Sequence, residues 1–503
     1  MSKNNFIKNS LYTTRVFLVC FYLLVVQGLV ISKGQNNTNS PYSRFGIGDL
    51  NSITFARNLA LGGTEIGLNQ PLSINYGNPA AYSNLWFTTY EAGADFKQYE
   101  FKNSTSIHRS HTASLSYFDF AFPLKAQKWS LGFGLLPYSN VGYSITENKT
   151  NEFGDGEIRN YQGSGGLNNF HIGSGIKLTK KLSFGINTEY LFGSLNNNRK
   201  IYFLSPFYFD SEINKSTSIG SFHFKTGFQY TLDSLPLAKS DSVIAFEKKI
   251  SMLQDSLAKL INSSRTDSTS EKYELKNKLA GEIALAQQIR ESIVVKKVKS
   301  DWHLVLGLVA IPATNLTSRN STLVRSFRYF QYQNPESGTV VKDTILNKES
   351  EAGDIHLPFG AGFGFSLRKG SRWLFCADYS LQQWSDFSFL GQKDSLVNSW
   401  KVSAGIQYTP DDRSIKSYWK IMQYRLGFHY DKGFIKLNGT NISEMGLSAG
   451  FALPVRKAGT VLHFTFEGGK RGTTDNNLVL EKFLKVTIGF TINDKWFMKP
   501  KYD

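Results

Sequence analysis

The sequence predicts an all-β protein, a transmembrane antiparallel β-barrel of about 14 strands with an N-terminal hatch and an inserted α-helical hairpin. Three observations support this prediction. First, apolar and polar residues alternate in many segments, as in 484–492, where every second residue is apolar. Second, these segments run about ten residues, the length that a tilted strand needs to cross a bilayer. Third, tryptophans stand at segment ends, where their amphipathic rings suit a membrane interface: Trp86, Trp129, Trp302, Trp373 and Trp400.

The chain begins with the pattern of a secretory signal peptide, which we assign to 1–34. Basic residues precede an apolar run over 16–31, and the small residues Ser32 and Gly34 follow it. A permanent anchor is the rival interpretation, but the run is shorter than the roughly 20 residues that a spanning helix needs. Acylation at Cys20 is disfavoured because bulky residues precede it. We therefore expect export and a location in the cell outer membrane.

Charge and cysteine content restrict the class of protein further. The formal net charge is +17, and removal of the four Lys and Arg residues of 1–34 leaves a basic chain. An exported protein is not expected to bind nucleic acid, so outer-membrane lipid and lipopolysaccharide are the expected counter-charges. Only Cys376 remains after cleavage, which excludes an internal disulfide.

Fourteen alternating segments can be counted, and an even number suits a closed barrel with no exposed edge in lipid. We expect strands one to six within 86–232, strands seven to fourteen within 300–492, and a periplasmic tail at 493–503. The segments are centred near residues 93, 118, 133, 174, 187, 226, 307, 363, 377, 404, 428, 450, 465 and 488. The long connections between them, which predict extracellular loops, are 139–168, 194–220 and 312–357.

The connection at 233–299 is expected on the periplasmic side. Its pattern of apolar residues differs from that of the strand segments. Apolar residues recur there at steps of three and four, which predicts two helices projecting roughly 30–40 Å from the barrel. A self-contained hairpin and a docking arm for a periplasmic protein partner are both open interpretations. The first seam includes Phe246, Ile250, Leu253 and Leu257, whereas Ile283 and Leu285 are expected on the helix backs. We expect all six residues to contribute to docking of a partner.

Residues 35–85 lack strand alternation and are rich in turn residues, so this segment is expected to fill the lumen or hang below it. It ends with Asn78-Pro79-Ala80-Ala81, just before the first strand. This motif resembles the Asn-Pro-Ala motif of the FadL/TodX family, and the tail from Asn493 resembles the ending of such barrels from Bacteroidetes. The resemblance implies a fourteen-stranded barrel with a hatch gated at Asn78, Pro79 and Ala80, which conducts fatty acids or aromatic hydrocarbons. The helical insertion departs from the family pattern.

No enzyme is expected from the sequence. Gly446-Leu-Ser448-Ala-Gly450 has the spelling of a nucleophile elbow, but it lies in an alternating strand instead of a strand-to-helix turn. Four histidines are expected to point into a polar lumen, which is their ordinary place in a barrel: His171, His223, His429 and His463. Neither a metal nor another cofactor is expected.

Two functions remain open from the sequence. The leading hypothesis is passive uptake of hydrophobic small molecules, with apolar capture by the loop residues Phe203, Phe207, Tyr208 and Phe330. The alternative is a non-transporting barrel subunit of an envelope protein-secretion or assembly complex, which binds a periplasmic partner through 233–299.

A lateral exit is a further expectation under the transport hypothesis. Pro137 cannot donate a ladder hydrogen bond, and Gly142 follows it, so the third strand either ends there or opens the wall. The resemblance implies a kinked third strand whose gap releases ligand sideways into the bilayer.

Overall fold

The computed structural model describes residues 38–51, 54–152, 154–205, 207–233, 249–258, 277–288, 302–330, 338–455 and 459–494. The predicted signal peptide and all but the first two residues of the predicted tail lie outside this part of the chain. Asn493 and Asp494 belong to the last strand, so that strand ends two residues later than predicted.

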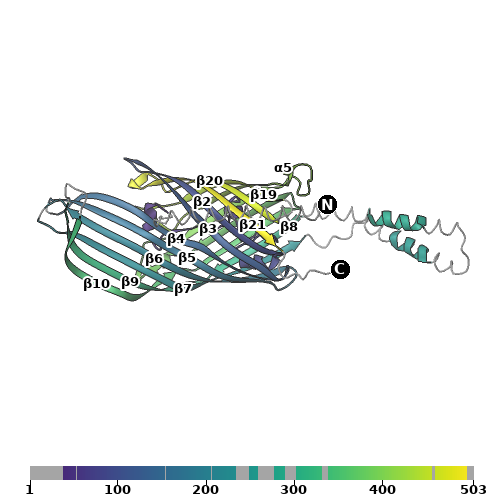
Figure 1. The fold of residues 1–503 in the computed structure, drawn as a ribbon, viewed down its shortest axis with the longest axis horizontal. Helices are drawn as coiled ribbons and strands as arrows, with labels where there is room; N and C mark the ends of the chain where they lie inside the picture. Colours follow the sequence, from purple (N-terminus) through teal and green to yellow (C-terminus); the bar gives the residue numbers. More distant parts are fainter. Residues whose placement is uncertain are drawn as a thin grey trace, which may run out of the picture.

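Antiparallel strands form a closed 14-stranded barrel (Figure 1). β2 (Thr88–Lys102) pairs with β3 (Ile107–Lys125) on one side and with β21 (Leu480–Asp494) on the other, which closes the sheet. The other wall strands, in order round the barrel, are β4 (Trp129–Thr150), β5 (Gly156–Lys177), β6 (Leu182–Phe203), β7 (Asp210–Asp233), β8 (Trp302–Ile311), β11 (Gly360–Lys369), β12 (Trp373–Gln382), β15 (Ser399–Tyr408), β16 (Gln423–Asp431), β19 (Glu444–Val455) and β20 (Thr460–Arg471). All fourteen predicted segment centres lie in these strands, in the predicted order.

The predicted extracellular loops are largely wrong, because strands continue through them. β4 to β7 each contain 22 to 24 residues, so 139–168 and 194–220 are mostly strand. The third predicted loop contains β9 (Thr314–Phe330) and β10 (Gly338–Leu357). These two strands prolong β8 and β11 past Pro312 and Pro358 without a change of register, because Ile311 pairs with Gly360 and Thr314 with Leu357.

The outer surface of the barrel carries an apolar belt. Large side chains on the outward positions of neighbouring strands are exposed, among them Phe133, Leu135, Phe170, Ile172, Ile186, Tyr190, Phe222, Phe224, Phe228, Leu308, Phe363, Leu426, Leu447, Phe466, Leu484 and Ile488. Such a belt would be unstable in water, and it fits the hydrocarbon of a bilayer. Trp129, Trp302 and Trp373 lie at the starts of their strands, on one rim of the belt.

The N-terminal segment fills the lumen. It contains η1 (Pro41–Arg44), β1 (Asp49–Leu50), α2 (Ala56–Leu59) and η2 (Pro79–Asn84), and we call residues 38–85 the plug. Its atoms form hydrogen bonds with inward-facing residues on strands from all sides of the barrel, including β2, β6, β12 and β20. A segment bonded to every side of the wall lies inside it, which decides between the two predicted positions.

Short elements line the barrel ends, and helices occupy part of the predicted insertion. The short elements are η3 (Trp384–Asp386), β13 (Ser388–Phe389), β14 (Gln392–Lys393), α5 (Tyr418–Ile421), β17 (Lys436–Leu437), β18 (Thr440–Asn441) and η4 (Asp475–Asn477). Residues 249–258 and 277–288 are helical and lie beyond the barrel end where β7 finishes and β8 begins (Figure 1). Among the described residues, no helix has the length and apolarity required to cross a membrane.

Candidate functional site: the plugged lumen

The Asn78-Pro79 turn rests on a row of glycines. Gly175 on β5 pairs with Gly185 on β6, which pairs with Gly227 on β7, so three neighbouring strands present backbone without side chains. A Cβ atom at Gly185 would lie 2.3 Å from the Pro79 carbonyl carbon, and one at Gly227 would lie 2.1 Å from Asn78 Oδ1. Only glycine allows this approach, because real Cβ atoms do not come so close to other heavy atoms.

Asn78 is buried and joins the plug to itself and to the wall. Its side-chain amide donates to the Ile66 carbonyl at 2.8 Å and to the Phe228 carbonyl of β7 at 3.2 Å. Its Oδ1 atom accepts from the Ala80 backbone amide at 3.1 Å and caps η2, with Pro79 in the first turn. The predicted hatch motif therefore fixes the plug in place in this structure.

A second group of contacts holds the plug against the opposite wall. Asp378 on β12 accepts hydrogen bonds from the backbone amides of Glu65, at 2.5 Å, and Ile66, at 2.9 Å. Ser448 on β19 accepts from the Gly62 amide at 3.1 Å. Ser448 belongs to the sequence that spells a nucleophile elbow, and its buried hydroxyl binds the plug backbone.

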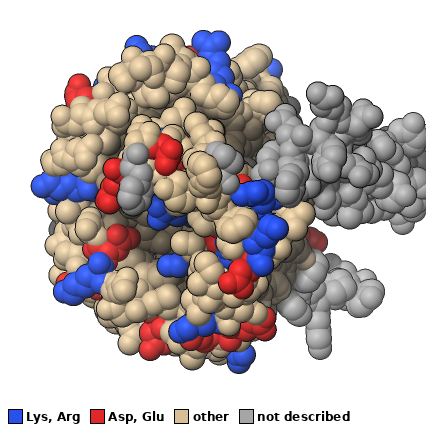
Figure 2. Space-filling model, turned by 90° about the vertical axis from the view of Figure 1, so that its left-hand side faces the viewer, with Lys and Arg blue, Asp and Glu red and all other residues tan. Residues whose placement is uncertain are grey.

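A cavity of about 460 Å³ remains beside the plug, and both charged and apolar side chains line it. The acidic residues in the lining include Glu65, Glu189, Asp378, Asp431, Glu444, Glu467 and Glu481, and the basic ones are Lys97, Lys225, Lys401, Arg471 and Lys485. Figure 2 shows that the barrel end facing the viewer is hollowed and that acidic and basic side chains stand around the hollow. The free space in the lumen is therefore bordered by many charged groups, next to apolar side chains such as Trp384 and Phe434.

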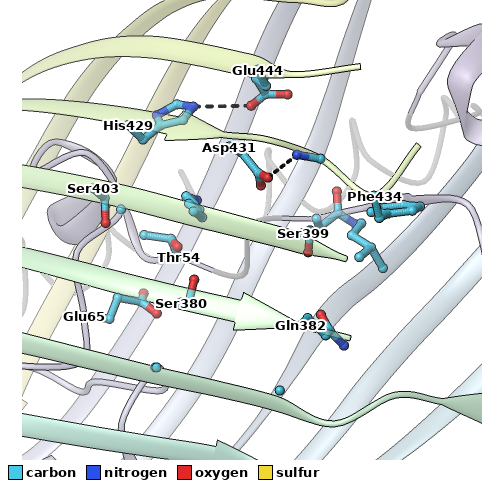
Figure 3. Close-up of a pocket in the computed structure, with 18 of the residues that line it drawn as sticks. Thr54, Glu65, Ser380, Gln382, Ser399, Ser403, His429, Asp431, Phe434 and Glu444 are labelled. Carbon is cyan, nitrogen blue, oxygen red and sulfur yellow. Dashed lines mark hydrogen bonds and ion pairs between the residues drawn. The ribbon is translucent and has the colours of Figure 1, made fainter. Parts of the chain in front are cut away.

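Ion pairs connect the cavity walls. His429 Nε2 lies 3.3 Å from Glu444 Oε1 (Figure 3), and its Nδ1 lies 3.4 Å from Glu467 Oε1. Arg471 on β20 lies 2.5 Å from Asp49, and this ion pair attaches the N-terminal part of the plug to the wall. Within the described residues no group of three or more His, Cys, Asp or Glu side chains could hold a metal ion.

Burial changes the acidity of two plug residues. It raises the pKa of Glu65 to about 7, against the opposing effect of the Lys225 ammonium. It lowers the pKa of Arg57 to about 10. Both shifts reflect the loss of water around the plug, because a low-dielectric environment disfavours the charged form of either group.

An apolar layer covers the outer part of the lumen. Trp384 of η3 and Phe434 stack at a centroid distance of 4.6 Å, and both pack in one buried cluster with Ile47 of the plug. The same cluster includes inward-facing residues of the long strands, such as Leu195 and Leu316. The buried aromatic side chains at this end are therefore packed against one another.

The predicted capture residues lie at the tips of the long strands, away from the plug. Phe207 is 90% exposed in the connection between β6 and β7, and Phe203 lies 5.3 Å from Tyr208 between ring centroids. Phe330 is the last residue of β9. Phe203, Phe207 and Tyr208 do not line the charged cavity.

The region of Pro137 contains a break in strand pairing. β3 pairs with β4 only up to Phe118 and Leu135, two residues before Pro137, whereas β5 pairs with β4 over its whole length with a register shift after Pro137. Beyond Leu135, β1 of the plug pairs with Ser139 and Asn140. The Gly142 amide donates to Ser43 Oγ at 3.1 Å. A lateral exit here remains a prediction, and this structure shows the plug at that edge.

The residues predicted for partner docking divide into two groups. Ile250, Leu253 and Leu257 are partly buried, as expected for a seam. Ile283 is also partly buried, so its assignment to the helix back is wrong. Leu285 is 57% exposed, as predicted, and Met252, which the sequence reasoning missed, is 56% exposed. Phe246 lies outside the described residues.

The fold and the site define a class of protein: a plugged transmembrane β-barrel with a charged lumen. A family model named BamG matches residues 14–295 and 292–503, so the chain belongs to the BamG family. The family shown by the sequence match is therefore BamG, whereas the Asn-Pro-Ala motif resembles the FadL/TodX family. No curated protein matches the chain.

Solved structures similar to this chain include two toluene transporters and a FadL homologue. The Pseudomonas putida toluene transporter TodX is 13% identical, with a TM-score of 0.48 over 89% of this chain and 100% of its own. The Ralstonia pickettii toluene transporter TbuX is 14% identical, with a TM-score of 0.48 over 87% and 98%. A Pseudomonas aeruginosa FadL homologue is 8% identical, with a TM-score of 0.48 over 88% and 98%.

Proposed function

We propose that this chain is a non-transporting barrel subunit of an envelope protein-secretion or assembly complex, which binds a periplasmic protein partner through the insertion at 233–299. The observation that carries the proposal is that the plug occupies much of the lumen. The plug is bonded to strands on all sides, and the remaining cavity is lined by charged groups. An apolar molecule in that cavity would strip water from ion-paired side chains without replacing their hydrogen bonds.

The barrel then serves as an anchor in the outer membrane, and its two ends are free to make contacts. On the helical side, Met252 and Leu285 expose apolar surface that the helices do not cover. Exposed apolar side chains on a projecting element are typical of a protein-binding surface. The partner proposed here is a periplasmic protein.

Replacement of these two residues by glutamate tests the proposal. Met252→Glu with Leu285→Glu should leave the helices intact, because both side chains are exposed, and it should remove apolar contact with the partner. We expect the amount of co-purified partner per barrel to fall by at least about tenfold, which corresponds to a loss of roughly 1.4 kcal/mol. The measurement is quantitative mass spectrometry of the protein purified in mild detergent from envelopes.

The exposed polar residue Gln287, on the same helix as Leu285, provides a matched control. Gln287→Glu introduces the same charge and should retain the partner. Retention of all partners by the double variant, or no stoichiometric partner with the wild-type chain, would refute the docking role.

Passive uptake of hydrophobic small molecules, similar to long-chain fatty acids or aromatic hydrocarbons, is the second candidate. The incomplete ladder between β3 and β4 favours it, because these two strands do not pair with each other beyond Leu135 and the wall could open there to the bilayer. Under this candidate, the plug must move during transport.

Asn78→Ala combined with Pro79→Ala tests the second candidate. The double variant loses the bonds to Ile66, Phe228 and Ala80, which should loosen the plug. If the barrel transports, uptake of a fluorescent fatty acid by cells with equal surface levels should change severalfold, since each lost hydrogen bond contributes about 1 kcal/mol. Equal uptake by variant, wild type and a strain lacking the protein would exclude the transport role.

A further inference from the structure

The long strands make one side of the barrel taller than the other. β4 to β7 have 22 to 24 residues, whereas β11, β12, β15 and β16 have 9 or 10. Figure 1 shows β6, β7, β9 and β10 reaching the end of the molecule opposite the two helices. On β7 the outward residues change from Phe222 and Phe224 to Ser218 and Ser216, so this part of the sheet stands beyond the apolar belt.

β10 forms a free edge of this tall sheet. One side of β10 pairs with β9 along its whole length. On the other side, its only strand partner among the described residues is β13, at Ile355 and His356. The edge from Gly338 to Gly353 thus presents backbone groups that no described strand pairs, and every residue from Val340 to Ala352 is exposed. A row of this kind is a template for another strand.

Apolar side chains lie along this edge of β10. Ile345 is 65% exposed, and Val340 and Val341 are also exposed. The tip between β6 and β7 adjoins them, because the Lys342 ammonium lies 5.8 Å from the centroid of the Phe209 ring. We call the exposed apolar residues of these two tips, taken together, the tip patch: Leu204, Phe207 and Phe209 between β6 and β7, and Val340, Val341 and Ile345 on β10.

We propose that the β10 edge and the tip patch bind an extended segment of a second protein at the cell surface, which adds to the sheet as a strand. The free edge of β10 fits an extended polypeptide, because its alternating amide and carbonyl groups can pair with those of another extended backbone. Lipid acyl chains do not fit this edge, because they carry no groups that could bond its free amides and carbonyls. The partner segment carries apolar residues at alternate positions, which cover Val341 and Ile345.

The irregular register of β10 argues for a short partner segment instead of a second copy of this chain. The pairing of β10 with β9 shifts register at three places, which lie between Val341 and Asp343, between Thr344 and Leu346, and between Lys348 and Glu351. Two copies of so bulged a strand could not pair continuously, whereas a peptide of a few residues can pair between two bulges. The proposal is independent of the periplasmic insertion, which lies at the other end of the barrel.

Hydrogen exchange and substitution test the proposal. In full-length protein extracted with its partners, the amides of 338–353 should exchange at least about tenfold more slowly than in the barrel stripped of partners. Val341→Lys with Ile345→Lys should abolish this difference and release the surface partner. Asn148→Lys, at an exposed position on β4 of the same sheet, is the matched control and should retain both. Heat-modifiable migration of each variant in detergent gels checks that the barrel has folded.

A photo-crosslinking amino acid at Ile345 identifies the occupant. The expected product joins this chain to one other surface protein, and no such product forms from Asn148. Equal exchange in the two preparations, an adduct with a second copy of this chain, or an adduct with lipopolysaccharide would each overturn the proposal. Failure here leaves the hairpin function intact, since Met252→Glu with Leu285→Glu affects only the periplasmic partner.

Discussion

At the scale of single residues, inward-facing glycines determine where the plug can dock. Gly185 and Gly227 accept the Asn78-Pro79 turn, while Gly405 and Gly427 accept Leu61 and Gly62 on another part of the wall. The plug thus approaches the wall closely where side chains are missing. This arrangement gives its polar backbone direct contact with the barrel and leaves the charged groups to line the cavity.

Gly185→Leu should therefore displace the plug. The new side chain would occupy the position of Pro79, because even its Cβ atom would lie 2.3 Å from the Pro79 carbonyl carbon. Overpacking of this kind costs about 1–3 kcal/mol or more. We expect faster hydrogen exchange at 56–84 and increased ion conductance of the purified barrel in planar bilayers.

Gly468→Leu is the control for this substitution. Gly468 lies on β20, and a Cβ atom there would meet no atom within 4 Å. The control variant should show the same hydrogen exchange at 56–84 and the same ion conductance as the wild type. Unchanged exchange and conductance in Gly185→Leu would show that the glycine row does not hold the plug.

Sequence reasoning found part of this residue-level site. The Asn-Pro-Ala motif singled out Asn78, Pro79 and Ala80, and the role of these residues in gating stays a prediction. It did not show that Gly175, Gly185 and Gly227 lie side by side, because their alignment depends on the register between three strands. Strand pairing is a property of the folded sheet and has no local signal in one sequence.

At the scale of elements, strand prediction succeeded where lipid imposes a pattern. Strands in the belt must have apolar outward residues, so each shows period-two alternation. The outer halves of β4 to β7 and the strands β9 and β10 stand beyond the belt, where lipid requires no such pattern. They were predicted as loops for that reason, although backbone pairing makes them strands.

The prediction of the helical segments was also partly right and partly wrong. Steps of three and four along the chain predicted helices, and 249–258 and 277–288 are helical. The error at Ile283 has a simple cause. Ile283 follows Leu279 by four residues and precedes Ala286 by three, so it lies on the same helix face as both. Glu282, the neighbouring residue, is exposed.

At the scale of the whole molecule, the barrel combines a closed interior with two distinct ends. The plug and the apolar layer occupy the lumen, one end continues into the tall sheet with its free edge, and the helical segments lie beyond the other end. A wall of 14 strands could enclose a wide channel, but here the plug occupies part of the interior and leaves a cavity of about 460 Å³. We interpret the barrel as a membrane anchor that presents surfaces for protein contact on both sides of the membrane.

The mass of the native particle tests this account most directly. The protein is extracted from envelopes in mild detergent, purified through a tag and measured by native mass spectrometry, with a known stable outer-membrane complex from the same extract as a control for extraction. We expect a particle heavier than the 56.6 kDa of the full chain. This particle should contain one copy of the barrel and at least one other protein in a fixed ratio. Recovery of the barrel alone, while the control complex stays intact, would contradict it.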